Sequence, residues 1–348
     1  MRRGARIAAV AGTVVFVGVV AMAFRSLTAL GVLASDPEPV KLACHMISGV
    51  TGAQDFAIDR KANLLFISAA NARKPDTADG LYVLHLDEAN ARPERMAGSP
   101  KDFHPHGISL FVAPDGSRTL MAIHHPKPDE SGVEVFDVVN AKGGVALKSR
   151  TSIDSSLLSH ANDIVAVDPE RFYATNQTGS GTGFGKMMEM FAIWPRGSVV
   201  YFDGRMFRPG ASGLSFPTGI AASADGTTVY VSELLGRKIT LFTREPYSGT
   251  LTKSGEIAIS GGPDKIDVDG ATLWTTAHPK PMQLQSAMAH PKQASPSDVW
   301  RVDGTTPTLV YANDGKPFSA AAAAVSANGH LYVGSVFDSG ILDCTLPH

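Results

Sequence analysis

Residues 218–235 read TGIAASADGTTVYVSELL, an apolar stretch, a turn at Asp225-Gly226, and a second stretch in which apolar and polar residues alternate. This pattern predicts two antiparallel strands joined by a hairpin. The pattern occurs six times, and the repeats begin at Asp55, His106, Asn162, Thr218, Asp264 and Ala322. Their starts are roughly fifty residues apart, which is the period expected of a β-propeller blade. The sequence therefore predicts an all-β fold, a six-bladed β-propeller.

The residues that open the six repeats are expected to meet around the central tunnel, because equivalent positions of propeller blades face the same axis. These residues are Gln54, Asp55, His106, Asn162, Asp163, Thr218, Asp264 and Lys265. Most of them carry oxygen donors, which suit calcium, whereas zinc would require converging histidine or cysteine. The alternative is that they bond only to the backbone at the strand starts.

The N-terminus differs in composition from the rest of the chain. Arg2, Arg3 and Arg6 precede an apolar stretch that runs from residue 7 to residue 24. This is the form of an export signal, either cleaved after the small residues near Ala23 or kept as a membrane anchor. We expect residues 1–25 to be a signal peptide or signal anchor, 26–43 a linker, and 44–348 the propeller. In both cases the propeller is expected outside the cytoplasm, either periplasmic, secreted or membrane-anchored.

Composition and cysteine content narrow the classes of function. The formal net charge of 348 residues is −2, so the sequence gives no electrostatic basis for a nucleic-acid partner. No G-x-S-x-G motif is present, which argues against a serine hydrolase. The two cysteines, Cys44 and Cys344, lie near the two ends of the predicted propeller. In an oxidising compartment this placement predicts a disulfide that closes the ring, and the alternative is two unrelated thiols.

Short motifs along the chain resemble the paraoxonase/arylesterase family, in the same order. They are residues 103–109 (FHPHGIS), 124–126 (HHP), 162–167 (NDIVAV), 172–176 (FYATN), 232–235 (SELL) and 278–279 (HP). The resemblance extends roughly from Cys44 to Cys344. The family that it indicates is related to the gluconolactonase-like and strictosidine-synthase-like propellers. It implies a six-bladed propeller with two calcium ions in its tunnel and a disulfide between its ends, where Cys44 and Cys344 stand here.

The resemblance also implies metal ligands. For the structural calcium they are Asp55, Asp163 and the backbone carbonyl of Ile108, all as in the family. Around the catalytic calcium the family has a glutamate, two asparagines and an adjacent aspartate and asparagine. The matching positions here are Gln54, Asn162, Thr218, Asp264 and Lys265, of which only Asn162 and Asp264 are kept. Because calcium affinity depends on ligand charge, and because an ammonium repels a cation, we expect one structural calcium ion and a weak or absent second ion.

The resemblance further implies hydrolysis of a small-molecule carboxylic ester or lactone. In the family a histidine pair matching His106 and His125 is proposed to activate water, while calcium polarises the substrate carbonyl. Both histidines are present, and Lys265 is expected to replace the calcium charge next to the oxyanion. His278, Val336 and Phe337 are expected to line the substrate pocket. His104 and His124 are expected to be supporting groups or exposed turn histidines.

Other interpretations remain open. Lys265 pairing with Asp163 or Asp264 would form a neutral plug, and the chain would then be a non-catalytic exported propeller used for binding or as a scaffold. A strictosidine-synthase-like enzyme would need a tunnel glutamate, and no repeat starts with one. Residues 178–194 are expected to form a lid helix, a membrane-contacting segment or a packed excursion, and residues 281–297 a surface loop or short helix.

Overall fold

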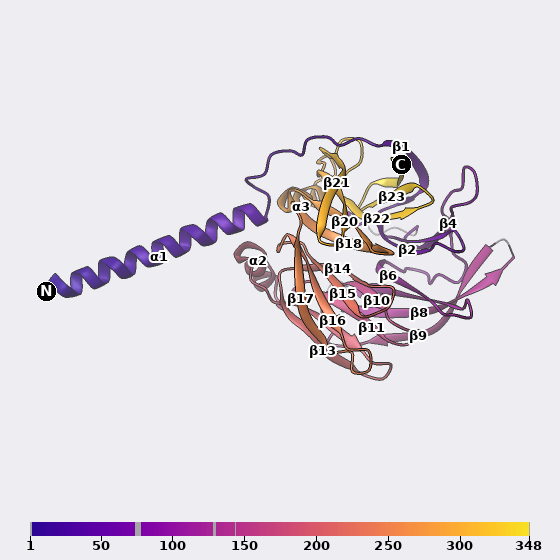
Figure 1. Ribbon diagram of the computed structural model, residues 1–348, viewed down its shortest axis with the longest axis horizontal. Coiled ribbons are helices and arrows are strands. Elements are labelled where there is room, and N and C mark those ends of the chain that lie inside the picture. The colour runs from indigo at the N-terminus through magenta and orange to yellow at the C-terminus, as the bar shows by residue number, and fades with distance from the viewer. Residues whose placement is uncertain (1, 74–77, 128–129, 143, 348) are drawn as a thin grey trace.

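The computed structural model describes residues 2–73, 78–127, 130–142 and 144–347. Its strands form six four-stranded antiparallel sheets. The innermost strand of each sheet contacts that of the next, and the sixth contacts the first, so the sheets close into a ring (Figure 1). A disulfide joins Cys44 to Cys344. The predicted six-bladed propeller closed by a disulfide between its two ends is confirmed.

Five blades each use four consecutive strands, ordered from the tunnel outward. Blade 1 has β2 (Ala53–Asp59), β3 (Leu64–Ala69), β4 (Gly80–His85) and β5 (Glu94–Arg95); blade 2 has β6 (Pro105–Val112), β7 (Arg118–Lys127), β8 (Glu130–Ala141) and β9 (Gly144–Asp154). Blade 3 has β10 (Ala161–Ala166), β11 (Phe172–Asn176), β12 (Gly197–Phe202) and β13 (Phe207–Leu214); blade 4 has β14 (Pro217–Ala222), β15 (Thr228–Glu233), β16 (Lys238–Arg244) and β17 (Leu251–Ala258). Blade 5 has β18 (Gly262–Asp269), β19 (Thr272–His278), β20 (Ser297–Asp303) and β21 (Thr306–Asn313).

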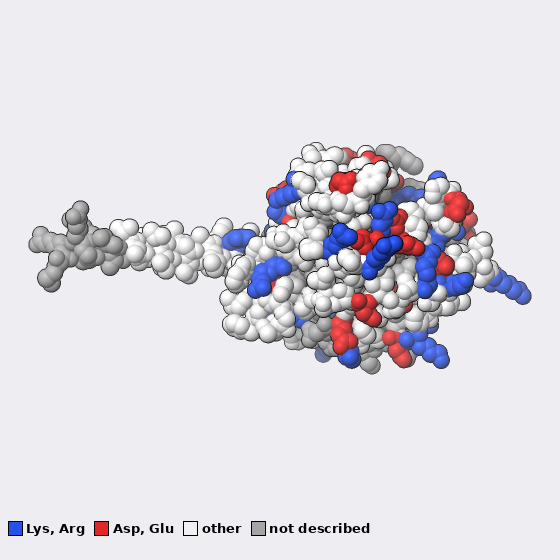
Figure 2. Space-filling view, turned by 90° about the horizontal axis from the view of Figure 1, so that it is seen from below, with Lys and Arg blue, Asp and Glu red and all other residues white. Residues whose placement is uncertain are grey.

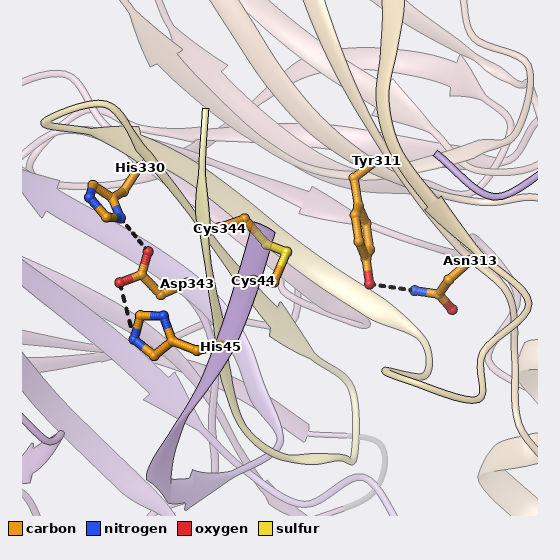
Figure 3. The surroundings of a disulfide bond; sticks show 7 residues. All are labelled: Cys44, His45, Tyr311, Asn313, His330, Asp343 and Cys344. Atoms are coloured by element: carbon orange, nitrogen blue, oxygen red, sulfur yellow. Dashed lines mark hydrogen bonds and ion pairs between the residues drawn. A yellow bond between two sulfur atoms is a disulfide. The ribbon is translucent and has the colours of Figure 1, made fainter. Parts of the chain in front are cut away.

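The sixth blade takes strands from both ends of the described chain. Its inner strands are β22 (Ala321–Ala327), β23 (His330–Ser335) and β24 (Ser339–Thr345), and its outermost strand is β1 (Ala43–Thr51). β1 pairs antiparallel with β24, and Cys44 stands directly opposite Cys344 in this register. Figure 3 shows the resulting disulfide between the two strands. The disulfide therefore holds together the one sheet whose strands are far apart in the sequence.

The hydrophobic core is divided among the interfaces between neighbouring blades. At one interface Phe66 and Leu81 of blade 1 pack against Leu120 and Phe136 of blade 2, and all four are fully buried. Comparable clusters lie at the other interfaces. Burial of such side chains is the main favourable contribution to folding. Because this core lies between the blades, the tunnel is left for polar side chains.

Helix α1 (Arg2–Ala29) projects away from the propeller (Figure 1), and its segment Val10–Ala29 is long and apolar enough to cross a membrane. The helix extends beyond residue 25 into the stretch expected to be a linker. Its last residue, Ala29, and the following Leu30 are buried on the propeller against Leu234 and Leu235. Residues 178–194 and 281–297 each contain a short helix, α2 (Gly183–Ala192) and α3 (Pro281–Ala289). Both helices lie at the end of the propeller that α1 meets (Figure 1).

Replacing both cysteines by alanine should destabilise the propeller, because the disulfide links positions 300 residues apart. In the chain-entropy model a loop of this length corresponds to about 5 kcal/mol, as an upper value. Chemical denaturation of the wild type, the double variant and the reduced wild type provides the measurement. The last two should unfold at the same, lower midpoint. An unchanged midpoint would show that β1 holds the ring closed without the covalent bond.

Candidate active site

A cavity of about 430 Å³ opens at the end of the tunnel that carries the helices. Its upper wall is apolar and includes Leu30, Met190, Phe216, Leu284 and Val336. Its floor is polar and consists of Gln54, His106, Asn162, Thr218, Asp264 and Lys265, which all come from residues that open the repeats. A concave apolar chamber with a few converging polar groups is the usual form of a small-molecule site.

A β-bulge on each innermost strand brings the floor residues together. In all six blades the register of the inner hairpin shifts at the start of the first strand, for example between Pro263 and Ile266 in blade 5. Such a bulge redirects side chains out of the sheet plane, here into the tunnel. The blades approach so closely here that a Cβ on Gly219 would lie 2.3 Å from the carbonyl oxygen of Asp264. Only glycine fits this position.

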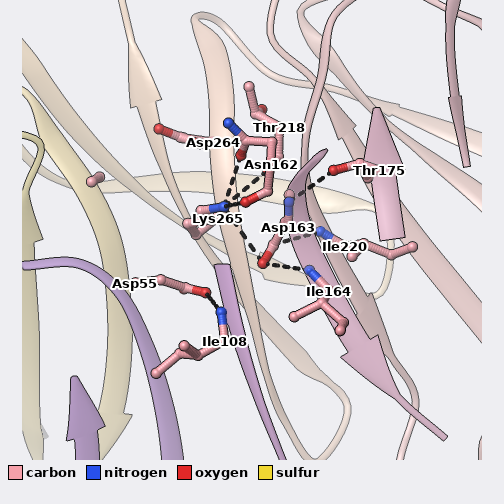
Figure 4. Close-up of polar contacts among 12 residues, drawn as sticks. Asp55, Ile108, Asn162, Asp163, Ile164, Thr175, Thr218, Ile220, Asp264 and Lys265 are labelled. Carbon is pink, nitrogen blue, oxygen red and sulfur yellow. Dashed lines mark hydrogen bonds and ion pairs between the residues drawn. The ribbon is translucent and has the colours of Figure 1, made fainter. Parts of the chain in front are cut away.

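Lys265 lies at the centre of the floor and is 3% exposed. Its Nζ donates hydrogen bonds to Asn162 Oδ1 at 2.8 Å, to the Asn162 carbonyl at 3.0 Å and to the Thr218 carbonyl at 3.2 Å (Figure 4). Asp163 Oδ1 lies 3.5 Å from the same nitrogen. An ammonium group has three protons, so these hydrogen bonds use all of them. Lys265 thus joins blade 5 to blades 3 and 4 through a buried charge.

Two buried carboxylates, Asp55 and Asp163, lie below the ammonium. Asp55 accepts hydrogen bonds from the backbone N–H of Phe56 and Ile108, and Asp163 accepts from those of Ile164 and Ile220. Burial, and then repulsion by Asp163, raise the pKa of Asp55 well above its usual value. Burial also raises the pKa of Asp163, while Lys265 opposes this shift. The centre of the propeller therefore holds two buried carboxyl groups next to one buried ammonium group.

The residues expected to bind a structural calcium ion fit this role. Asp55 and Asp163 are buried carboxyl groups whose pKa values are raised by burial, and carboxylate oxygens are the ligands that a calcium ion prefers. The backbone N–H of Ile108 donates a hydrogen bond to Asp55. Among the described residues no group of three or more His, Cys, Asp and Glu side chains is arranged to hold a metal, so further ligands would be carbonyl oxygens or water.

The residues at the second calcium position do not fit a metal ion. Gln54 Nε2 donates to the Ala70 carbonyl, and Thr218 Oγ1 donates to the Pro263 carbonyl at 2.9 Å. Asp264 Oδ2 lies 3.1 Å from His278 Nε2. Asn162 Oδ1 already accepts from the Lys265 ammonium. Each potential ligand is engaged within the protein, and the lysine brings its own positive charge to the place where an ion would bind.

His106 and His125 lie near each other at the cavity, with ring centroids 5.6 Å apart. Within the described part of the chain, Nδ1 of His106 is buried without a hydrogen-bond partner. His125 Nδ1 contacts Ser131 Oγ at 3.2 Å. Burial, and then the positive charge of Lys265, lower the pKa of His106 well below its usual value. Burial also lowers the pKa of His125. Both imidazoles are therefore held neutral.

The remaining residues expected at the pocket lie in different places. Val336 lines the cavity. His278 is fully buried behind Asp264, and Phe337 packs under the guanidinium of Arg73, 3.5 Å from its ring centroid. Sequence reasoning did not single out Asp79, a buried residue of the cavity wall whose Oδ2 lies 2.8 Å from His104 Nδ1. Of this pair only His104 belongs to a motif that the sequence shows, the His-Pro-His of residues 104–106.

Comparison with known proteins gives the following matches. A family model described as Arylesterase matches residues 38–346. Human serum paraoxonase/arylesterase 1 is 31% identical over 87% of this chain and 89% of its own length. Mouse serum paraoxonase/lactonase 3 is 28% identical over 91% and 92%.

Solved structures of other propellers match the fold. A putative gluconolactonase covers 91% of this chain and 97% of its own, with a TM-score of 0.53 and 14% identity. A calcium-binding protein, regucalcin, from Agrobacterium tumefaciens covers 89% and 95%, also with a TM-score of 0.53 and 14% identity. At this level of identity the two structures support the fold alone.

Replacing Lys265 by methionine should destabilise the chain more at pH 8 than at pH 5. The raised pKa values mean that the folded chain holds carboxyl protons to higher pH than the unfolded chain, so stability falls as pH rises through these values. Removing the ammonium raises both pKa values further and steepens this fall. Breaking a buried ion pair typically costs about 3 to 5 kcal/mol, which we expect at pH 8.

Urea denaturation in chelator at both pH values provides this measurement. Lys253→Met is the matched control, because Lys253 pairs with Glu256 on the surface and its loss should change little. Equal destabilisation by Lys265→Met at the two pH values would contradict the electrostatic role of the lysine.

Proposed function

We propose that this chain, which belongs to the arylesterase family, hydrolyses carboxylic esters or lactones in the cavity and does so without a catalytic metal ion. The family match covers residues 38–346, almost the whole chain. The observation that carries the proposal is the Lys265 ammonium, which is bonded to Asn162 Oδ1 at the cavity floor. Its charge takes the place of a catalytic cation.

The polar floor offers the groups that ester hydrolysis needs. His106 and His125 are neutral imidazoles at the cavity and so are in the form that accepts a proton from water. The charge of Lys265 lies in a water-poor site, where it would stabilise negative charge that develops on a carbonyl oxygen. The apolar upper wall would hold the hydrophobic part of the substrate.

A second function is favoured by one observation. All three protons of the Lys265 ammonium are bonded to Asn162 and Thr218, so the lysine has no proton left for an oxyanion unless a bond is exchanged. In this alternative the lysine only stabilises the ring, and the chain is an exported binding or scaffold module. In both functions we propose one calcium ion, held by Asp55 and Asp163, with a structural role.

Wild-type hydrolysis of phenyl acetate and of a lactone panel should persist in chelator. Lys265→Met should lower kcat by about 100-fold or more, the usual effect of removing an oxyanion-stabilising group. The full chain in detergent is the sample, and circular dichroism in chelator controls for unfolding. Loss of wild-type activity in chelator while the fold persists would contradict metal-free hydrolysis. No hydrolysis under any condition would favour the scaffold.

The triple variant Gln54→Glu, Thr218→Asn, Lys265→Asn tests whether these three residues are what excludes the second calcium ion. It restores the ligand types that the family has at the second calcium position and removes the competing ammonium. We expect it to bind one calcium ion more than the wild type does, and any hydrolysis it shows should require calcium. Metal analysis after extensive washing provides the count, and equal counts would contradict the replacement of the ion by Lys265.

We also propose that the chain is exported and remains anchored to a membrane. The middle of α1 carries no charged side chain, whereas charges gather on the propeller (Figure 2). Phe184, Phe191 and Trp194 of the α2 region are strongly exposed at the end of the propeller that α1 meets. Such apolar side chains suit a membrane interface. The disulfide fits an oxidising compartment.

Membrane fractionation and intact mass of the exported protein test the anchor. The full-length chain should stay with the membrane through a carbonate wash and show no free thiol. A soluble mature chain that begins near residue 24 would instead show cleavage. A cytoplasmic propeller with reduced cysteines would contradict export itself.

A further inference from the structure

The wall of the cavity contains a second histidine arrangement, independent of His106 and His125. His104 lies immediately before β6, and its Nδ1 is 2.8 Å from Asp79 Oδ2. Asp79 is 4% exposed, and its Oδ1 accepts the N–H of Asn71 at 3.1 Å. Arg95 Nη2 donates to the backbone carbonyl of Asp79 at 3.2 Å. These contacts hold Asp79 in place next to the imidazole of His104.

This arrangement defines the protonation of the His104 ring. An ionised carboxylate only accepts hydrogen bonds, so the proton between Asp79 and His104 belongs to Nδ1. Nε2 is then the ring nitrogen with the free lone pair, and His104 and Asp79 both line the 430 Å³ cavity. A buried carboxylate that orients an imidazole and stabilises its protonated form is the arrangement by which a histidine becomes an effective base.

His106 lacks such a partner. Its Nδ1 is buried and has no hydrogen-bond partner within the described part of the chain. His104, with a side chain 34% exposed, has both the partner and access to the cavity. We propose that His104, oriented by Asp79, is the general base of this site. The inference rests on the proposed ester or lactone hydrolysis.

In the proposed step His104 acts as the general base and water as the nucleophile. Nε2 of His104 takes a proton from water as the water oxygen bonds to the substrate carbonyl carbon, and the carbonyl electrons move to its oxygen. When the tetrahedral species collapses, the ester C–O bond breaks and the imidazolium returns its proton to the leaving oxygen. The products are a carboxylic acid and an alcohol, or a hydroxy acid from a lactone. Nδ1–H remains bonded to Asp79 throughout.

His104→Asn separates chemistry from structure. An asparagine amide can still donate to Asp79 but has no group at the place of Nε2. The full chain should keep its thermal unfolding midpoint and KM, while kcat falls by about 100-fold, within the range for a general base. Added imidazole should partly restore kcat to a His104→Gly variant, which a merely structural role would not allow.

The chain offers a matched control in His330, whose Nδ1 lies 2.6 Å from Asp343 Oδ1. This pair also joins a histidine Nδ1 to a carboxylate oxygen, and His330 is about as exposed as His104, but it lies near the disulfide (Figure 3) and not at the cavity. His330→Asn should leave kcat unchanged.

The outcomes distinguish the two proposals. Wild-type hydrolysis that survives unchanged in His104→Asn would overturn the role of His104 and leave the proposed function intact, with His106→Gln then showing the larger loss. A wild type without hydrolytic activity would overturn both. A fall in kcat with imidazole rescue, together with an unaffected His330→Asn, would support His104 as the base.

Discussion

The hydrogen bonds from the buried ammonium of Lys265 to Asn162 and Thr218 are the interaction on which the centre of this propeller depends. They connect blade 5 to blades 3 and 4. The backbone N–H of Ile108 bonds to Asp55 and so connects blades 1 and 2, while Ile220 bonds to Asp163 and connects blades 3 and 4. Because these groups are buried, an unpaired charge among them would be costly, so the lysine and the two carboxylates require one another.

The sixth blade takes no part in this polar centre, and the structure holds it differently. Its inner strand begins with four buried alanines, residues 321–324, which offer no side-chain hydrogen bonds to the tunnel. Blade 6 instead gains its outermost strand from the N-terminal side of the ring and a disulfide across that pair. Leu30, just beyond the end of α1, also lines the cavity, so the N-terminal segment reaches the candidate site.

The sequence predicted most of the fold because each inner hairpin carries its own local signal. All six observed inner strands begin within two residues of the predicted repeat starts. The pairing of β1 with β24 has no local hairpin signal, since it joins segments from opposite ends of the ring, and only the two cysteines indicated that these ends meet. The short outer strand β5 covers only Glu94 and Arg95, both exposed, and lacks the apolar alternation that marks a strand.

The candidate site was predictable to a similar degree. The polar residues at repeat starts were identified because repetition places them at one axis, and Lys265 was predicted to disfavour a metal ion there. The Asp79–His104 pair was not, because Asp79 precedes the third strand of its blade and meets the cavity only through the local path of the chain. His278 was expected on the wall but lies one layer behind it, bonded to Asp264.

Anomalous diffraction from crystals of the protein grown with a lanthanide in place of calcium tests the central claim most directly. The account predicts a peak near Asp55 and Asp163, and none within bonding distance of Asn162 Oδ1, where the Lys265 ammonium lies. A peak bonded to Asn162 Oδ1, with the lysine side chain displaced, would contradict it and would show that the site keeps a metal ion.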